Sequence, residues 1–166
     1  SPMTSSSLLA RLPLVFEPNH GQSSQPVKFL ARGRGYGLFL TPKEAVLTLS
    51  RSANSQSSSL RMQFAGASSS AINGLEPLPG HTNYFIGNDS SHWRRNVPQF
   101  GRVRYDDLYP GIKLDFYGRA GRLEYDFTVA PGADPREIAL EFDGVDHIKI
   151  AQNGDLVLTT AGRELR

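Results

Sequence analysis

Apolar residues along this chain fall in short segments that alternate with polar residues or run unbroken for a few positions, and Gly, Pro, Asn or Ser separates the segments. Alternation with a period of two indicates a strand with one buried face, and the separating residues favour turns. This pattern predicts an all-β fold, an antiparallel β-sandwich of roughly 10–12 short strands. The predicted strands are Val27–Ala31, Tyr36–Leu40, Ala45–Leu49, Leu60–Phe64, Ile72–Leu78, His81–Ile86, Phe100–Tyr105, Ile112–Tyr117, Leu123–Val129, Ala139–Phe142, His147–Ile150 and Leu156–Thr160.

Helical patterns are almost absent from the chain. No window of about 11 residues keeps the helical apolar period without a Gly or Pro inside it. Single turns of helix are predicted at Thr41–Glu44 and at Asp134–Ile138, where Asp134 would cap a turn begun by the proline that follows it. The serine-rich segments Ser50–Ser59 and Ser68–Ser70 are predicted to be surface loops.

Composition narrows the class of protein. The 166 residues, of which 39% are hydrophobic, suffice for one domain with its own core, so we predict a single sandwich over residues 12–166. Residues 1–11 are interpreted as a disordered segment or a remnant of cloning. The absence of cysteine excludes disulfides and a thiol nucleophile. The 18 basic and 16 acidic residues are scattered and no apolar run is long enough for a membrane span, so neither a nucleic-acid partner nor a membrane span is predicted.

The clearest local prediction is a β-hairpin formed by Ile112–Tyr117 and Leu123–Val129, with residues 118–121 as its loop. In this register Asp115 lies directly opposite Glu124. Parity then separates apolar from polar side chains. The apolar face holds Ile112, Leu114, Phe116, Leu123, Tyr125 and Phe127. The polar face holds Lys113, Asp115, Tyr117, Arg122, Glu124 and Asp126.

A second hairpin is predicted near the end of the chain, where the apolar segments Ile148–Ile150 and Leu156–Leu158 flank a polar loop. That loop contains Asn153 and Gly154, the residue types that most readily adopt the positive φ angles of tight hairpin turns. The two segments are therefore expected to pair as antiparallel neighbours.

The facing carboxylates Asp115 and Glu124 are the candidate catalytic residues. Opposite positions in a hairpin place Cβ atoms about 4.5–5.5 Å apart, close enough for two acids to share a proton and do acid–base chemistry, as glycosidase pairs do. With Asp126 the pair could instead supply oxygen ligands to Ca²⁺, the one metal considered; otherwise no cofactor is expected. The third interpretation, which the interleaved charges favour, is a solvated polar face in which Lys113 and Arg122 neutralise the acids.

Trp93, the only tryptophan, lies in a polar segment rich in turn-forming residues. An aromatic ring among polar side chains can stack on a sugar while its neighbours bind the hydroxyl groups. The alternative is that the ring covers an edge of the sandwich and bonds its N–H to the backbone. The candidate ligand-binding residues are Trp93, His92, Arg94, Asn88, Asp89 and Tyr117.

Four segments carry a resemblance to a known family: the FEPNHGQ sequence from Phe16, Val27–Thr41, Asn83–Gly118 and Leu123–Asp134. They resemble the N-terminal domain of large bacterial proteins that carry SBBP (β-propeller-type) repeats. The resemblance implies export to the medium or the cell surface, an all-β fold and downstream repeat domains of the same chain as partners. It implies no catalytic residues, because that domain has no assigned activity.

Three functions are therefore considered, in order of decreasing expectation. The first is a non-catalytic module of a secreted or cell-surface multi-domain protein that binds a glycan or another surface ligand. The second is a purely structural cap that orients downstream β repeats. The third is a glycan-active hydrolase that uses Asp115 and Glu124. The fold alone does not choose among them, because sandwiches serve all three roles.

Overall fold

The computed structural model describes residues 14–33, 35–49, 58–68, 70–120, 122–154, 156–160 and 162–165. The interpretation of residues 1–11 and most of the loop predicted at Ser50–Ser59 lie outside this part of the chain. The described strands are β1 (Glu17–Pro18), β2 (Phe29–Gly33), β3 (Tyr36–Leu40), β4 (Glu44–Leu49), β5 (Ser58–Phe64), β6 (Ile72–Tyr84), β7 (Arg94–Tyr109), β8 (Ile112–Arg119), β9 (Arg122–Val129), β10 (Leu140–Asp143), β11 (His147–Ile150), β12 (Leu156–Thr160) and β13 (Arg163–Leu165). Two 3₁₀ turns, η1 (Ser90–His92) and η2 (Pro135–Glu137), complete the described elements.

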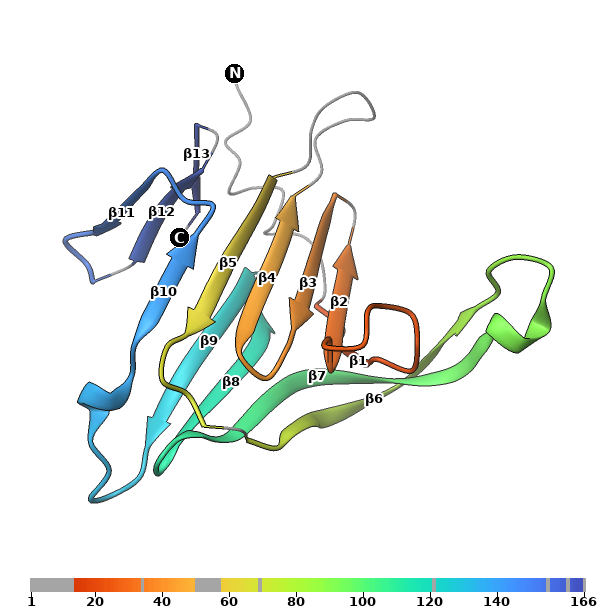
Figure 1. The fold of residues 1–166 in the computed structure, drawn as a ribbon, viewed down its shortest axis with the longest axis horizontal. Coiled ribbons are helices and arrows are strands. Elements are labelled where there is room, and N and C mark those ends of the chain that lie inside the picture. Colours follow the sequence, from red (N-terminus) through yellow and green to blue (C-terminus); the bar gives the residue numbers. More distant parts are fainter. Residues whose placement is uncertain are drawn as a thin grey trace.

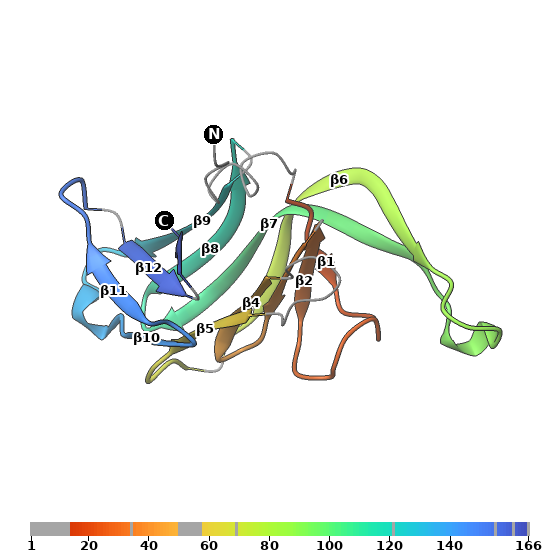
Figure 2. The ribbon, with the colours of Figure 1, turned by 90° about the horizontal axis from the view of Figure 1, so that it is seen from above.

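The described strands form three antiparallel sheets, which confirms the all-β prediction (Figure 1). A six-stranded sheet has the order β1-β2-β3-β4-β5-β10, a four-stranded sheet has the order β6-β7-β8-β9, and β11, β12 and β13 form a small third sheet. The two larger sheets enclose the core between them (Figure 2). No described helix is long and apolar enough to cross a membrane.

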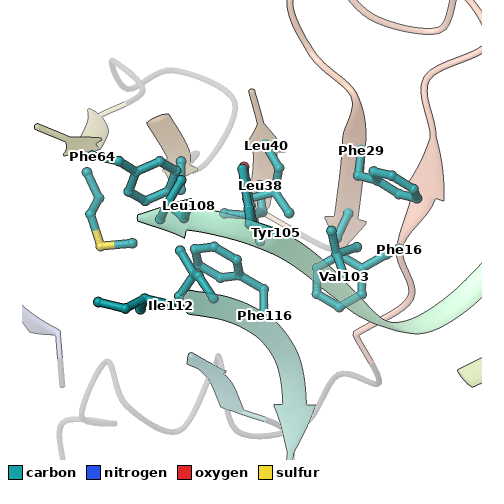
Figure 3. Close-up of a cluster of buried hydrophobic side chains, with 14 of the residues drawn as sticks. Phe16, Phe29, Leu38, Leu40, Phe64, Val103, Tyr105, Leu108, Ile112 and Phe116 are labelled. Atoms are coloured by element: carbon teal, nitrogen blue, oxygen red, sulfur yellow. The ribbon is translucent and has the colours of Figure 1, made fainter. Parts of the chain in front are cut away.

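The core consists of apolar side chains that both large sheets turn inward (Figure 3). Its buried members are Phe16, Phe29, Ala31, Leu38, Leu40, Ala45, Met62, Phe64, Val103, Tyr105, Leu108, Tyr109, Ile112, Leu114 and Phe116. Tyr105 joins the two sheets, because its ring meets Phe64 edge to face at 5.3 Å and its hydroxyl donates to Thr41 O at 2.6 Å. The buried Tyr105 ring packs between the sheets while its hydroxyl keeps a hydrogen bond, and together these contacts favour one position of the sheets relative to each other.

Most predicted strands are present, with three differences. The predicted strands Ile72–Leu78 and His81–Ile86 are joined in one strand, β6, which continues through a register shift between Leu78 and His81 and ends at Tyr84, before Phe85 and Ile86. β7 begins well before the predicted Phe100, in a polar stretch that lacks apolar alternation. The short strands β1 and β13 were not predicted.

Of the two predicted helical turns, one is wrong and one is confirmed. Thr41–Glu44 is a tight connection between β3 and β4, in which the Thr41 hydroxyl accepts the backbone N–H groups of Lys43 and Glu44. That local bond replaces a helical turn. At Asp134–Ile138 the carboxylate of Asp134 accepts the Arg136 N–H at 2.9 Å and caps η2, as predicted.

The predicted register of the β8–β9 hairpin is wrong by two residues. Arg119 pairs with Arg122, so the turn is shorter than expected, and Asp115 lies opposite Asp126 rather than Glu124. Ala120 has φ +50°, as the two-residue hairpin turns that match strand twist require. Because a shift of two preserves parity, the predicted division into apolar and polar faces is still correct.

The second predicted hairpin is confirmed. β11 and β12 pair antiparallel, with Ile148 opposite Leu158 and Ile150 opposite Leu156. In the connection Gly154 has φ +90°, but its neighbour in the Asn-Gly sequence does not have a positive φ. Among the described residues of this connection, the glycine supplies the positive φ that the turn uses.

Candidate functional site

β6 and β7 continue beyond the rest of their sheet as a projecting two-stranded hairpin, which we call the arm (residues 77–100; Figures 1 and 2). The pairing of β7 with β8 reaches only to Arg102, so β8 and β9 do not support the arm. An isolated two-stranded hairpin is marginal in water, so the arm needs other contacts. The N-terminal segment supplies them, since Phe16 exchanges two backbone hydrogen bonds of 2.8 Å with Phe100.

Glu17 is the main polar contact at the root of the arm. Its buried carboxylate accepts hydrogen bonds from the hydroxyl groups of Thr82 and Tyr84, and Gln99 Nε2 donates to the Thr82 hydroxyl at 2.8 Å. Burial, followed by the bond to Glu17, raises the pKa of Tyr84 to about 12. Charge-assisted bonds to a buried carboxylate are stronger than neutral ones, so this cluster holds β6 against β1.

The loop between β1 and β2 forms a second contact with the arm. Asn19 organises this loop, because its amide donates to the carbonyls of Ser24 and Val27 at 2.9 Å. The loop presents the carbonyl of His20 to Arg94, whose Nε donates to it at 2.5 Å. The FEPNHGQ sequence that begins at Phe16 therefore builds the seat of the arm, a role that sequence reasoning did not assign to it.

Replacing Glu17 with Gln is expected to lower the free energy of unfolding by about 1–2 kcal/mol, because an amide cannot accept from both hydroxyls as a carboxylate does. Amide hydrogen exchange is expected to speed up in the arm and to stay slow in β8. Tyr84→Phe, which removes one donor and leaves the carboxylate, is the matched control with a smaller effect. Equal acceleration across both large sheets in Glu17→Gln would show that Glu17 supports the whole fold and not the arm.

The end of the arm, which we call the arm tip (residues 85–95), carries a cluster of two rings and a guanidinium group. Phe85 and Trp93 meet edge to face at 5.3 Å, and Arg95 Cζ lies 5.4 Å from the Phe85 centroid and 5.5 Å from the Trp93 ring. Trp93 Nε1 donates to the Gly87 carbonyl at 3.0 Å. Phe85 is nevertheless 57% exposed and Ile86 is 65% exposed. The arm tip thus displays apolar surface to solvent.

The outermost part of the arm tip is polar and is fixed by its own hydrogen bonds. Asp89 caps η1 by accepting the Ser91 N–H at 2.9 Å, and this bond holds the pKa of the Asp89 carboxyl below its ordinary value. His92 Nδ1 lies 3.6 Å from Asp89 Oδ2. Asn96 has φ +55° and donates its backbone N–H to Asn83 Oδ1 at 2.9 Å. These bonds organise the loop that carries the apolar residues.

The structure brings five of the six sequence-predicted ligand residues together at the arm tip. These are Asn88, Asp89, His92, Trp93 and Arg94. The guanidinium of Arg94 is already bonded to the carbonyls of His20, Ser91 and Trp93. Sequence reasoning missed Phe85, Ile86 and Arg95, although two large apolar residues directly before the Gly-Asn turn are the available signal.

The sixth predicted ligand residue, Tyr117, lies elsewhere. It pairs with Arg102 on the outer face of the four-stranded sheet. A strand rises about 3.3 Å per residue, so the stretch from Arg102 back to Trp93 places Tyr117 roughly 30 Å from the arm tip. Arg102 Cζ lies 4.3 Å from the centre of its ring, and its hydroxyl donates to Asp126 at 2.7 Å and to Glu124 at 3.2 Å. The bond to Asp126, together with burial and the bond to Glu124, raises the pKa of Tyr117 to about 12.

Asp115, the first candidate catalytic acid, is enclosed by arginines. It accepts from Arg102 at 2.9 Å and from Arg104 at 2.7 and 2.8 Å, and its side chain is 6% exposed. Burial raises the pKa of this carboxyl, but the arginine hydrogen bonds and charges outweigh burial and leave the pKa below its ordinary value. A carboxylate held ionised by two cations is suited to an ion-pair network and not to sharing a proton with Glu124.

The centre of the polar face is a connected network of hydrogen bonds and ion pairs around Asp115 and Tyr117. Arg102 also bonds to Glu76 at 3.2 Å, so the network extends to β6. Within the described residues, no group of three or more His, Asp or Glu side chains is placed to hold a metal ion. The arrangement fits the favoured sequence interpretation, a charge-balanced surface, although arginines from β7 neutralise Asp115 instead of the expected Lys113 and Arg122.

Comparison with known proteins places the chain in a family. Residues 16–166 match the model described as a domain of unknown function, DUF7948. The chain belongs to this family. No curated protein and no solved structure gives a significant match. The resemblance to a domain without assigned activity is therefore correct, while the association of the DUF7948 domain with SBBP repeats stays a prediction.

Proposed function

We propose that this DUF7948 domain is a non-catalytic binding module of a secreted or cell-surface multi-domain protein, and that it contacts its ligand through the arm tip. The observation that carries the proposal is the display of Phe85 and Ile86 beside the Trp93–Arg95 cluster at the end of a projecting hairpin. Tryptophan, tyrosine and arginine are the residue types most enriched among those that dominate binding energy, and the cluster contains Trp93 and Arg95.

The energetics support a role in binding. Full burial of a large apolar side chain contributes about 1.5–3 kcal/mol, and Phe85 and Ile86, which are 57% and 65% exposed, gain only part of it within their own domain. The loop is already ordered by the Asp89 cap and by the bond from Trp93 to Gly87. Prior ordering reduces the entropy lost on binding, so the arm tip can convert its apolar surface into affinity.

A glycan is the ligand class expected from the sequence, and the geometry changes which ring would meet it. Trp93 is half-buried and its indole N–H is bonded to the Gly87 carbonyl, so Trp93 supports the cluster. The exposed ring of Phe85 is the face on which a sugar would stack. Asn88 and His92 lie on the same exposed loop and would bind the hydroxyl groups.

The test uses Trp93 emission, since this is the only tryptophan and lies within the arm tip. Soluble glycans are titrated into the protein while emission and melting temperature are followed, because a ligand that binds only the folded state raises the melting temperature. Phe85→Ala is expected to weaken the interaction by about tenfold or more, with the melting temperature of the free protein unchanged. Leu78→Ala, a partly exposed apolar position of the arm outside the tip, is the matched control. Binding that survives in Phe85→Ala and in Trp93→Phe would place the ligand elsewhere and reject the arm tip.

A further inference from the structure

The most exposed large apolar side chains of the described residues form two separate patches. Phe85 and Ile86 belong to the arm tip, whereas Ile148 is 53% exposed and Ile150 is 75% exposed on β11. Both views place the arm tip and β11 at opposite ends of the molecule (Figures 1 and 2). Exposed apolar patches of this kind mark interaction sites more often than chance.

The patch on β11, which we call the β11 face, is a strand surface. Ile148 and Ile150 are two positions apart and so point to the same side of the sheet, together with their cross-strand partners Leu158 and Leu156. Leu158 is buried and Leu156 is half-buried, so the apolar side of β12 is covered while that of β11 is open. The β11 face is therefore a shallow apolar surface that a protruding side chain can meet.

The two patches differ in charge. Arg95 is exposed at the arm tip and has no carboxylate partner among the described residues. β10 leads into β11 at the same end of the molecule (Figures 1 and 2) and carries the exposed acids Glu141 and Asp143. The ammonium group of Lys149 on β11 is already paired with Glu164 at 3.0 Å. Arg61, the cross-strand partner of Asp143, is already paired with Glu44 at 2.6 Å. The arm tip carries Arg94 and Arg95 against Asp89 and is locally basic, whereas the described residues near β11 are locally acidic.

We propose that the arm tip of one copy packs against the β11 face of a second copy, so that the domain self-associates head to tail. This inference rests on the proposed function and names the partner at the arm tip. Charge decides against the symmetric alternatives: a tip-to-tip contact would bring Arg95 of both copies together, and a face-to-face contact would do the same with Glu141 and Asp143. The head-to-tail contact pairs opposite charges and buries both apolar patches. The head-to-tail contact uses two different surfaces, so each copy in a pair keeps one free surface and a further copy can be added.

The experiment measures mass by sedimentation velocity for the whole 166-residue chain and for two variants. One variant removes the tip (Phe85→Ser with Ile86→Ser), and the other removes the face (Ile148→Thr with Ile150→Thr). We expect wild-type mass to rise with concentration and each variant alone to remain monomeric, with association weakened on the order of 30-fold or more. A mixture of the two variants is expected to form a 1:1 dimer that does not grow, because it contains one intact tip and one intact face.

Several results would overturn the proposal. A wild-type protein that stays monomeric at all concentrations would contradict it. Association that survives in either variant alone would also contradict it, because a symmetric contact needs only one of the two surfaces. Variants are accepted only with wild-type circular dichroism. Arg95→Glu is a second test on an exposed side chain, expected to weaken association about tenfold. A monomeric protein that binds a glycan through Phe85 would reject self-association and leave the proposed function intact.

Discussion

Replacing Asp115 with alanine is expected to lower the free energy of unfolding by about 2–3 kcal/mol. Its buried carboxylate accepts from Arg102 and from both nitrogens of the Arg104 fork, so the substitution removes a whole set of charge-assisted bonds. Breaking a buried ion pair by removing one partner can destabilise by about 3–5 kcal/mol. We expect the smaller loss of about 2–3 kcal/mol because both arginines are partly exposed and water can solvate them once the carboxylate is removed.

The dependence of this effect on pH has a definite sign. The pKa of Asp115 is lower in the folded protein than in the unfolded chain, so its contribution is complete above the unfolded value of about 3.9 and is lost as the pH falls through the folded value. Urea unfolding at neutral pH should therefore separate wild type from Asp115→Ala by the full amount. As the pH falls below about 4, the unfolding curves of wild type and Asp115→Ala should approach each other progressively, and the difference should disappear below the pKa of the folded state.

Glu124→Gln is the matched control for the Asp115 prediction, because both acids were proposed as a catalytic pair and only Asp115 is bound by arginines. Glu124 accepts a single 3.2 Å bond from Tyr117, so we expect a change of about 0.5 kcal/mol or less. Similar small losses in both variants would mean that the arginines contribute nothing to stability. The polar face would then be an unconnected surface.

Alternation and turn residues in the sequence were enough to predict the fold class and the faces of the β8–β9 hairpin. They could not fix its register, because a shift of two residues leaves every side chain on the same face. The observed register puts Tyr117, and not Asp115, opposite Glu124. The placement of Asp115 opposite Glu124 depended on register alone, which is why that placement was wrong while the division into faces was right.

The arm could not be predicted for a different reason. His81–Ile86 was predicted as a separate strand, and a local pattern does not reveal that β6 runs past the sheet it belongs to. What anchors the arm is a pairing of Glu17 with Tyr84, 67 positions apart in the chain. Long-range contacts of this kind carry no local signal. The role of Trp93 as a ligand residue stays a prediction, and the exposed apolar surface at the arm tip belongs to Phe85 and Ile86.

Replacing Gly144 with alanine is expected to lower the free energy of unfolding by about 3 kcal/mol or more. Gly144 follows β10 with φ +79°, a conformation that disfavours a side chain by about 1–2 kcal/mol. A Cβ atom there would also lie 2.2 Å from the backbone oxygen of Ser59 on β5. Backbone cannot move aside as a flexible side chain can, so the alanine must displace the corner between β10 and β11 from β5.

Gly132→Ala separates the two contributions, because Gly132 has φ +84° and no atom within 4 Å of its Cβ position. We expect this control to lose only the conformational part, about 1 kcal/mol, in the same urea unfolding measurement. The remainder for Gly144→Ala then measures how firmly the corner is held, since Thr160 also donates to the Gly144 carbonyl at 2.7 Å. Equal losses would mean that the corner can retreat from β5. The β11 face would then have no fixed place on the body of the domain, and a rigid partner such as the arm tip could not select it.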